Sequence, residues 1–269
     1  MEQVLKGQIA IITGASSGIG AGVAKSLALA GATVVVNYPG ESSKGAADAV
    51  LKDITDAGGA GIVAQCDVTS EEQVTKFFAD VVAQYGTIDI LVNNAGLQRD
   101  AKFDEMTLEQ WNTVINVNLT GQFLCARAAI REFLRRGPRP EVSAATGKII
   151  CMSSVHEAIP WGGHINYAAS KGGVKLLMQS LAQEYGDRHI RVNSICPGAI
   201  QTPINKSAWE TSQALNSLMT LIPYNRIGQP SDIGNLAVFL ASDQSDYITG
   251  ASIFIDGGMT VLESFADNG

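Results

Sequence analysis

The sequence is poor in the residues that mark disulfide frameworks, metal sites and membrane spans. Its 269 residues include four cysteines, with no CxxC pair and no histidine cluster beside them. We therefore expect buried thiols in a reducing compartment and no metal ion. No apolar stretch reaches the roughly 18 residues that a membrane span needs, and a strand-like run that begins by Gln8 leaves no room for a signal peptide. These absences predict a cytoplasmic protein with no membrane partner.

Positive charge and aromatic side chains are also scarce. The formal net charge is −7, and aromatic residues make up 6% of the chain. Nucleic-acid binding calls for a basic face, so we predict no nucleic-acid partner. The one break in composition, RRGPRPEVSAATG at 135–147, is interpreted as a solvated surface loop. Hydrophobic residues make up 46%, which is enough to bury one sizeable core.

Apolar strand-like runs alternate with helical patterns along the whole chain. Strands are predicted at 8–14, 32–38, 61–68, 87–96, 147–155, 190–198 and 251–258, and helices at 18–31, 41–59, 70–85, 107–136, 167–185 and 231–241. Strands that are apolar on both faces belong to a parallel sheet covered by helices on each side. We therefore predict an α/β fold with a single domain, residues 1–269, built on a doubly wound, Rossmann-like parallel sheet of about seven strands. The polar segment 202–229 interrupts this alternation and is predicted to be a substrate lid within the domain.

The segment TGASSGIG, residues 13–20, lies between the first strand and the first helix. Gly14 permits a tight turn, Gly18 lets the backbone approach a pyrophosphate, and Gly20 lets the helix pack closely on the strand. The N–H groups at the start of the helix would face the anion. This pattern predicts a dinucleotide site with contacts from Gly14, Ser16, Ser17, Gly18, Ile19 and Gly20.

Polar residues follow several later strands, and the carboxyl ends of parallel strands share the sheet edge where ligands bind. The second strand ends in Asn37 and Tyr38. These positions offer neither a carboxylate to repel a 2′-phosphate nor an arginine to attract one, so we expect NAD and NADP both to be used. The other predicted cofactor contacts at this edge are Asp67, Val68, Asn94, Ala95, Gly96, Pro197, Gly198, Ile200 and Thr202.

Tyr167 and Lys171 belong to the sequence YAASK and lie four residues apart on a predicted helix, hence on one face. A phenol titrates near about 10, which is too high for a base at neutral pH, and a neighbouring ammonium lowers that value. Ser154, at the end of the preceding strand, can hydrogen-bond a reacting oxygen. Asn118 is a polar residue among apolar neighbours on the long helix. We predict an acid–base centre formed by Asn118, Ser154, Tyr167 and Lys171.

Together, TGASSGIG, NNAG, NVNLTG, Ser154 with YAASK, and PGAIQT resemble the short-chain dehydrogenase/reductase family in order and spacing over essentially the whole chain. The resemblance implies that Tyr167 is the proton acid/base, and that Lys171 binds the nicotinamide ribose while lowering the tyrosine pKa. It implies that Ser154 positions the substrate oxygen and that Asn118 holds a water of a proton relay. It also implies a small-molecule substrate, hydride transfer with nicotinamide, and a homotetramer with helices 107–136 and 167–185 at one interface.

A narrower resemblance, to bacterial glucose 1-dehydrogenases, is carried by CMSSVHEAIPW (151–161), PGAIQTPIN (197–205) and IDGGMT (255–260). It implies oxidation of a sugar at C1 to the lactone. Trp161 either lines the pocket or simply packs in the fold. The chain departs from that pattern in having Gln98 where those enzymes have Glu and Gln201 where they have Asn. The substrate contacts expected from this resemblance are Gln98, Ser154, His156 and Gln201.

Two other functions stay open. A carbonyl reductase of 3-oxoacyl thioesters or small ketones would use the same centre, although the VHEAIPW segment offers no apolar mouth for a long acyl chain. A non-catalytic dinucleotide sensor would need only the cofactor half of the site. The sensor hypothesis therefore leaves the complete Asn118, Ser154, Tyr167 and Lys171 set without a purpose.

Overall fold

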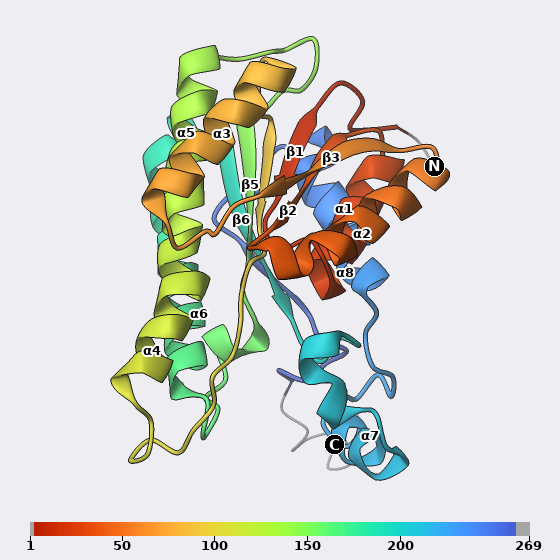
Figure 1. Cartoon of the computed structure of the whole chain (residues 1–269), viewed down its shortest axis with the longest axis vertical. Coiled ribbons are helices and arrows are strands. Elements are labelled where there is room, and N and C mark those ends of the chain that lie inside the picture. The colour runs from red at the N-terminus through yellow and green to blue at the C-terminus, as the bar shows by residue number, and fades with distance from the viewer. Residues whose placement is uncertain (1–2, 262–269) are drawn as a thin grey trace.

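The structure is a computed structural model that describes residues 3–261 (Figure 1). Seven parallel strands form one sheet in the order β3-β2-β1-β4-β5-β6-β7. The strand order changes direction between β1 and β4, so the predicted doubly wound α/β fold is confirmed. The strands are β1 (Ile9–Ile12), β2 (Thr33–Tyr38), β3 (Ala60–Gln65), β4 (Ile90–Asn93), β5 (Gly147–Met152), β6 (Ile190–Pro197) and β7 (Ser252–Ile255).

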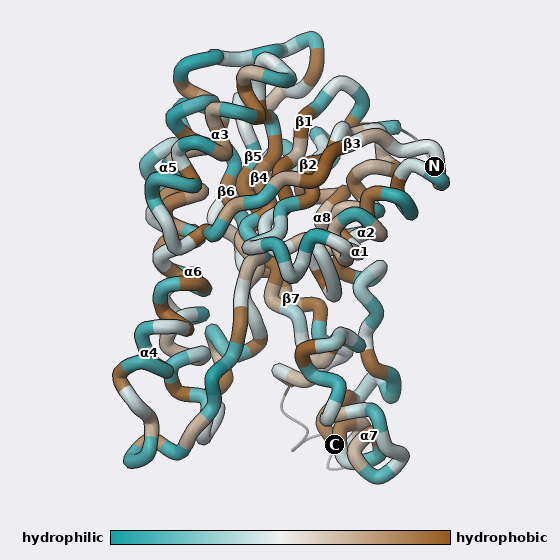
Figure 2. Tube along the Cα trace, viewed as in Figure 1, coloured by the Kyte–Doolittle hydropathy of each residue, from teal (hydrophilic) through white to brown (hydrophobic). Residues whose placement is uncertain are grey.

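Helices cover both faces of the sheet, and Figure 2 shows the apolar residues concentrated along the strands between them. Side chains alternate along each strand, so Ala10 and Ile12 join one apolar layer and Ile9 and Ile11 join the other. The layer with Ala10 and Ile12 packs against α1 (Gly18–Leu29), α2 (Lys44–Asp56) and α8 (Pro230–Ala241), and the layer with Ile9 and Ile11 packs against α3 (Glu71–Tyr85), α5 (Gly121–Arg136) and α6 (Ile165–Tyr185).

Among the helices within residues 3–261, none combines the length and the hydropathy needed to cross a membrane.

The long helix predicted at 107–136 is interrupted. Thr107 begins α4 (Leu108–Ile115) with a capping box to Gln110. Residues Asn116–Thr120 then form a π turn before α5 follows. A π turn inserts one residue into the helical repeat and rotates the side chains around it. Here Asn118 is fully buried and hydrogen-bonds the backbone of Leu97, a long-range contact that the local pattern does not display.

The segment 202–229 contains two short helical pieces, Pro203–Ala208 and α7 (Ser212–Met219). Its two ends lie side by side, because Ile200 forms a parallel bridge with Gly228 and the N–H of Gln201 donates to the Gly228 carbonyl oxygen at 2.8 Å. Beyond this narrow base, α7 lies apart from the layers that cover the sheet (Figure 1). The expectation that this segment is a lid stays a prediction.

Candidate active site

The carboxyl ends of the strands meet at one edge of the sheet, which faces α4 and α7 in Figure 1. The loops that leave β1, β4, β5 and β6 start at this edge. The predicted cofactor and catalytic residues lie on these loops or on the helices that follow them. Their side chains differ in what they contact.

The turn between β1 and α1 requires glycine. Gly14 and Gly18 have φ angles of 60° and 56°, the left-handed region that glycine adopts without strain. A Cβ atom at Gly14 would lie 2.9 Å from the Cα of Ala95. Asn94 holds the turn in place, since its Nδ2 donates to the carbonyl oxygens of Thr13 and Gly14 at 2.9 and 3.1 Å. The glycine turn is therefore fastened to the loop that follows β4.

At the end of β2, the cofactor contacts expected of Asn37 and Tyr38 stay predictions, and the structure shows what these side chains contact within the chain. Asn37 is buried, its Oδ1 accepts from the N–H of Gly14 at 3.0 Å, and its Nδ2 donates to the carbonyl oxygen of Cys66 at 3.1 Å. Tyr38 is also buried, in the apolar layer under α1 and α2. The Asn37 amide therefore braces the glycine turn, because its atoms are committed to backbone groups. The exposed residue at this strand end is Pro39.

The start of α1 suits a phosphate group. Ser17 occupies the N-cap position, yet within residues 3–261 its side chain accepts no hydrogen bond from the first helical turn. The N–H groups of that turn are therefore free to face an anion, and the helix dipole favours negative charge there. A Cβ atom at Gly18 would lie 3.4 Å from Thr202, so the start of segment 202–229 closes over the turn. These residues, with Ser16 beside them, fit the pyrophosphate of a dinucleotide.

The remaining predicted cofactor residues line the same edge. Asp67 shapes its own loop, because its Oδ1 accepts hydrogen bonds from the N–H and hydroxyl of Thr69 at 2.9 and 2.8 Å. Val68 packs against Gly121, where a Cβ atom would lie 2.8 Å from the valine side chain. The others, which lie beside the glycine turn or at the ends of β4 and β6, are Ile19, Gly20, Ala95, Gly96, Pro197, Gly198 and Ile200.

Ser154, Tyr167 and Lys171 come together beside the end of β5. The buried Ser154 hydroxyl accepts from the N–H of His156 at 3.2 Å and lies next to the Tyr167 phenol. Lys171 is buried one turn further along α6, where its Nζ donates to the carbonyl oxygen of Met152 at 2.8 Å. The same Nζ lies 5.3 Å from the centroid of the Tyr167 ring. Two hydroxyls and one ammonium are thus gathered in one place.

Burial dominates the electrostatics of this group. It raises the pKa of Tyr167 above its usual value, while the Ser154 hydroxyl lowers that pKa and Asp100 raises it. The net shift is upward, opposite to the one expected from Lys171, because burial disfavours the phenolate more than its neighbours favour it. Burial also lowers the pKa of Lys171 to about 8, against the opposing effect of three neighbours, Cys151, Cys196 and Glu157.

Asn118 connects the loop after β4 to α6. Its Oδ1 accepts from the N–H of Leu97 at 2.8 Å, and its Nδ2 donates to the Leu97 carbonyl oxygen at 3.0 Å and to the Ser170 hydroxyl at 3.2 Å. Ser170 in turn donates to the carbonyl oxygen of Tyr167 at 2.7 Å. Asn118 therefore fixes the loop that carries Gln98. The proton-relay role expected of Asn118 stays a prediction.

Three aromatic rings form a stack next to Tyr167. Trp161 lies between His156, at a centroid distance of 4.2 Å, and His164, at 3.5 Å. Both faces of the indole are covered, so Trp161 holds His156 in place and has no free face for a ligand. Nδ1 of His156 lies 3.2 Å from the carbonyl oxygen of Ile159, which only accepts, so Nδ1 carries the proton and Nε2 is an acceptor. Burial lowers the pKa of His156, which favours this neutral form.

The two glutamines expected to bind substrate lie on separate loops at this edge. Gln98 is half-buried on the loop after β4. Gln201 lies at the base of segment 202–229, where its Oε1 accepts from Nε2 of Gln229 at 2.8 Å. Gln201 is therefore already engaged by a neighbour, and the expectation that the two glutamines bind substrate stays a prediction.

The sequence analysis missed three residues of this region. Thr13 accepts hydrogen bonds from the N–H groups of Asn94 and Ala95 at 2.9 and 3.0 Å, and Ser170 links Asn118 to α6. Both residues stand inside motifs already singled out, TGASSGIG and YAASK, so their place in those motifs was an available signal. Glu157 has a fully buried side chain, which nothing in the sequence around it indicates.

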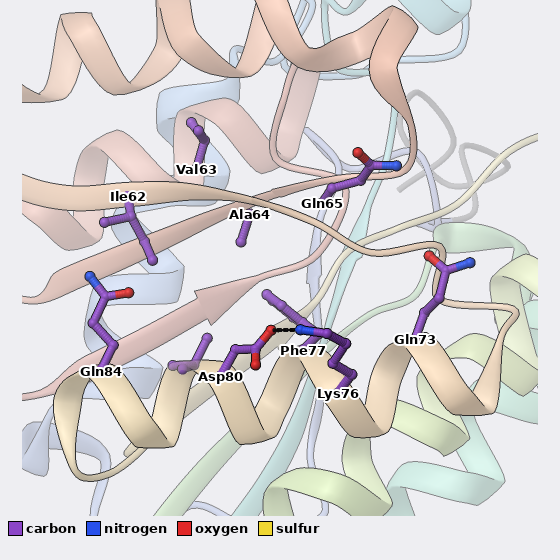
Figure 3. Close-up of a pocket in the computed structure, with 10 residues that line it drawn as sticks. Ile62, Val63, Ala64, Gln65, Gln73, Lys76, Phe77, Asp80 and Gln84 are labelled. Atoms are coloured by element: carbon purple, nitrogen blue, oxygen red, sulfur yellow. Dashed lines mark hydrogen bonds and ion pairs between the residues drawn. The ribbon is translucent and has the colours of Figure 1, made fainter.

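One cavity lies away from this group. It has a volume of about 390 Å³ and runs between β3 and α3, with Ile62 and Phe77 in its wall (Figure 3). The ion pair between Lys76 and Asp80, at 2.6 Å, joins two side chains one turn apart on α3 beside the cavity. None of the predicted site residues lines this cavity. The candidate active site is therefore identified by the chemistry of its side chains and not by the size of a cavity.

Comparisons with known proteins match the chain over almost its full length. A family model described as "Enoyl-(Acyl carrier protein) reductase" matches residues 14–260. A 3beta-hydroxysteroid dehydrogenase 1 of Eggerthella lenta is 44% identical over 261 residues, which are 97% of each chain. Glucose 1-dehydrogenase 2 of Bacillus subtilis is 37% identical over 265 residues, 98% of this chain and 99% of the relative. A solved gluconate 5-dehydrogenase from Burkholderia cenocepacia, in complex with NADP and tartrate, has a TM-score of 0.87 and 34% identity, over 96% of this chain and 97% of that one.

The names of these relatives give different substrates, but all of them belong to one family. The sheet order, the glycine turn and the Ser154, Tyr167 and Lys171 group agree with that family. From the full-length match and these identities, the chain belongs to the short-chain dehydrogenase/reductase family of NAD(P)-dependent oxidoreductases.

Proposed function

We propose that this protein is an NAD(P)-dependent dehydrogenase that oxidises a hydroxyl on a saturated ring, with a sugar hydroxyl such as C1 of glucose as the first candidate. The observation that carries this proposal is the gathering of the Ser154 and Tyr167 hydroxyls above the buried Lys171 ammonium. The relatives that act on glucose and on a hydroxysteroid by name support the ring alcohol as substrate.

In this proposal the substrate oxygen lies between the two hydroxyls. Ser154 donates a hydrogen bond to that oxygen, and Tyr167 as phenolate takes the hydroxyl proton. The positive charge of Lys171 stabilises the phenolate and holds the nicotinamide ribose. A bound nicotinamide supplies the acceptor for the hydride that leaves the substrate carbon, so the alcohol becomes a carbonyl with loss of one hydride and one proton.

The residues that would hold the cofactor are those of the glycine turn and the neighbouring loops. The uncapped start of α1 would bind the pyrophosphate, and the Asp67–Val68 loop would lie against the adenine. Pro39, the exposed residue at the end of β2, carries no charge, so the 2′-phosphate of NADP meets neither repulsion nor a specific cation there. We expect NAD and NADP both to be accepted.

The neutral form of His156, with Nε2 as a hydrogen-bond acceptor, favours a sugar as the substrate. Its Nε2 is a hydrogen-bond acceptor next to the Tyr167 ring, at a centroid distance of 6.3 Å. An acceptor in this place matches a second hydroxyl adjacent to the reacting one, as a sugar provides. Gln98 and Gln201, which can donate or accept, would serve further hydroxyls. Because Gln98 is neutral, its bonds to the sugar are weaker than those of a carboxylate, and a broad sugar range is expected.

A hydroxysteroid is the second candidate. Phe103, Ile204 and Leu221 are exposed apolar side chains on the loop before α4 and on segment 202–229. Apolar side chains on these two segments would suit an extended apolar ring system. The relative from Eggerthella lenta is named as acting on the 3β-hydroxyl of a steroid.

Segment 202–229 would act as a lid over either substrate. Its two ends are paired at Ile200 and Gly228, so the rest of the segment can move about a narrow base. Thr202 touches the glycine turn, which links cofactor binding to the position of the segment. If the segment is a lid, substrate with cofactor will slow its cleavage by protease, and an unchanged cleavage rate would exclude this role.

The decisive experiment compares kcat/KM for glucose, its epimers, a 3β-hydroxysteroid, small ketones and an acetoacetyl thioester, with NAD and NADP. We expect the highest value for a sugar. A highest value for the steroid moves the assignment to the second candidate. Activity on the thioester or the ketones above every alcohol makes the protein a carbonyl reductase, and cofactor binding without turnover of any compound makes it a sensor.

A further inference from the structure

The carbonyl oxygen of Met152, the last residue of β5, accepts hydrogen bonds from two buried side chains. Nζ of Lys171 donates to it at 2.8 Å, and Nε2 of Gln122 donates to it at 3.2 Å. A carbonyl oxygen has two lone pairs, so it can accept both hydrogen bonds at once. The Gln122 amide therefore shares its acceptor with the ammonium that the proposed mechanism places against the nicotinamide ribose.

The orientation of Gln122 is fixed on both sides. A carbonyl oxygen only accepts hydrogen bonds, so the atom of the amide that faces Met152 is the nitrogen. The backbone carbonyl oxygen of Gln122 accepts from Nδ2 of Asn93 at 3.0 Å. Asn93 is the last residue of β4 and pairs with Cys151, so Met152 lies one residue beyond the pairing with β4. Gln122 thus joins the end of β4 to the unpaired end of β5 on this side.

The start of α5 directs two buried amides at consecutive residues of α6. Asn118, in the π turn that precedes α5, donates to the Ser170 hydroxyl at 3.2 Å. Gln122, four residues later, reaches Lys171 through the Met152 carbonyl. The Lys171 ammonium has three N–H groups, and one of them is committed to Met152. The position of that carbonyl oxygen therefore determines where the other two N–H groups point.

A purely structural role for Gln122 would be to satisfy the buried Met152 carbonyl. Lys171 already donates to this oxygen, so the carbonyl has a partner without the glutamine. A second donor adds a fixed direction for the carbonyl, because Met152 lies beyond the last residue pair with β4. The burial of a polar glutamine at this place is explained by that added constraint.

We propose that Gln122 is a positioning residue, whose amide holds the Met152 carbonyl so that the Lys171 ammonium points at the nicotinamide ribose. This inference rests on the proposed function, since it matters only if Lys171 binds that ribose. Without the amide, the Met152 peptide is free to turn, and Lys171 follows its acceptor away from the ribose. The loss falls on the ribose next to the nicotinamide and spares the adenosine and pyrophosphate, which the glycine turn and its neighbouring loops would hold.

The test compares the dissociation constants of ADP-ribose, which carries the second ribose, and of ADP, which lacks it, by isothermal titration calorimetry. Gln122→Met keeps the length of the side chain and removes the donor. In this variant we expect affinity for ADP-ribose to fall by about three- to tenfold, the effect of one misplaced hydrogen bond, and affinity for ADP to stay within about twofold of wild type. Lys171→Met should remove most of the preference of the wild type for ADP-ribose.

Gln8→Met is the matched control. Oε1 of the buried Gln8 accepts from Nζ of the buried Lys148 at 2.7 Å. This variant therefore also takes an amide away from a buried lysine, but at the opposite edge of the sheet, where β1 and β5 begin. It should leave the ratio of the two dissociation constants unchanged, even if it lowers the unfolding temperature.

A folded Gln122→Met protein with the wild-type ratio would overturn the proposal. An equal fall in affinity for both ligands would overturn it as well, because that is the result of a purely structural role. If the variant does not fold, Gln122→Asn takes its place, since its amide is one methylene too short to reach the Met152 carbonyl, and the same ratio decides.

Failure of the proposed function looks different. In that case the wild type binds ADP-ribose no more tightly than ADP, or Lys171→Met leaves the preference for ADP-ribose intact. Failure of this inference alone leaves both the preference and its dependence on Lys171 in place.

Discussion

At the scale of single residues, the phenol oxygen of Tyr167 is the atom on which the proposed chemistry depends. Tyr167→Phe removes that oxygen and keeps the ring that packs between Lys171 and the aromatic stack. We expect turnover to fall by at least about a thousandfold, since no other group at this position can take the proton. NADPH affinity and the unfolding temperature should stay near wild type. Retention of more than a few per cent of kcat would exclude Tyr167 as the acid/base.

His156 allows a test of substrate recognition that leaves the chemistry in place. His156→Ala removes the Nε2 acceptor, and the loss of one hydrogen bond to a buried site costs about 1–3 kcal/mol, or roughly a 5- to 150-fold rise in KM for a sugar. KM for the cofactor should change little. Trp161→Leu, which removes the ring that holds His156, should raise the same KM to a smaller extent. An unchanged sugar KM in both variants would argue for the steroid or carbonyl substrates.

At the scale of secondary-structure elements, we expect the end of β2 to control cofactor choice. Tyr38 is buried in the apolar layer, so a carboxylate there would disrupt folding, whereas Pro39 is exposed. Pro39→Asp should lower kcat/KM with NADP about tenfold by repulsion of the 2′-phosphate and leave NAD almost unaffected. Pro39→Asn is the uncharged control. A wild-type enzyme inactive with NADP would contradict our interpretation of this strand end.

The contact between α1 and α8 depends on a glycine. A Cβ atom at Gly22 would lie 2.5 Å from the Cβ of Pro230 and 2.9 Å from its backbone, which cannot move without shifting α8. Gly22→Ala should therefore lower the free energy of unfolding by about 1–3 kcal/mol. Gly45→Ala on α2 is the matched control, because nothing lies within 4 Å and alanine is the better helix former. Urea unfolding of both variants measures this loss of stability. If Gly22→Ala and Gly45→Ala unfold at the same urea concentration, α8 moves to accept the added methyl group without cost.

At the scale of the whole molecule, we expect four copies of the chain to assemble. Leu108 on α4, Phe123 on α5 and Leu176 on α6 are exposed apolar side chains on the helices that the family resemblance placed at an interface. Light scattering after gel filtration should give four times the chain mass for the wild type. Leu176→Arg should reduce that mass, and Lys175→Arg, which keeps the charge next to it, should not. A wild-type mass equal to that of one chain would contradict the predicted tetramer.

The alternation of strands and helices could be predicted from the sequence, because runs such as IAII and TVVVNY are typical of strands in a covered parallel sheet and alternate with helical patterns. The glycines of the first turn and the Tyr167–Lys171 spacing also belong to local segments, so their positions followed from the chain alone. The π turn at Asn116–Thr120 could not be predicted. The π turn contains Asn118, whose side chain accepts from the N–H of Leu97 and donates to the Leu97 carbonyl oxygen, 21 residues away in the chain.

The sequence by itself determined which residues can do chemistry, since motif spacing along one strand-loop-helix unit fixes their order and their neighbours. Only the tertiary structure decided their surroundings. It made Asn37 a brace for the glycine turn, covered both faces of Trp161, and placed the Glu157 carboxylate in the interior beside α6. The physical reason is that burial and electrostatics depend on groups brought together from distant strands, and a pattern of neighbouring residues carries no information about the dielectric around them.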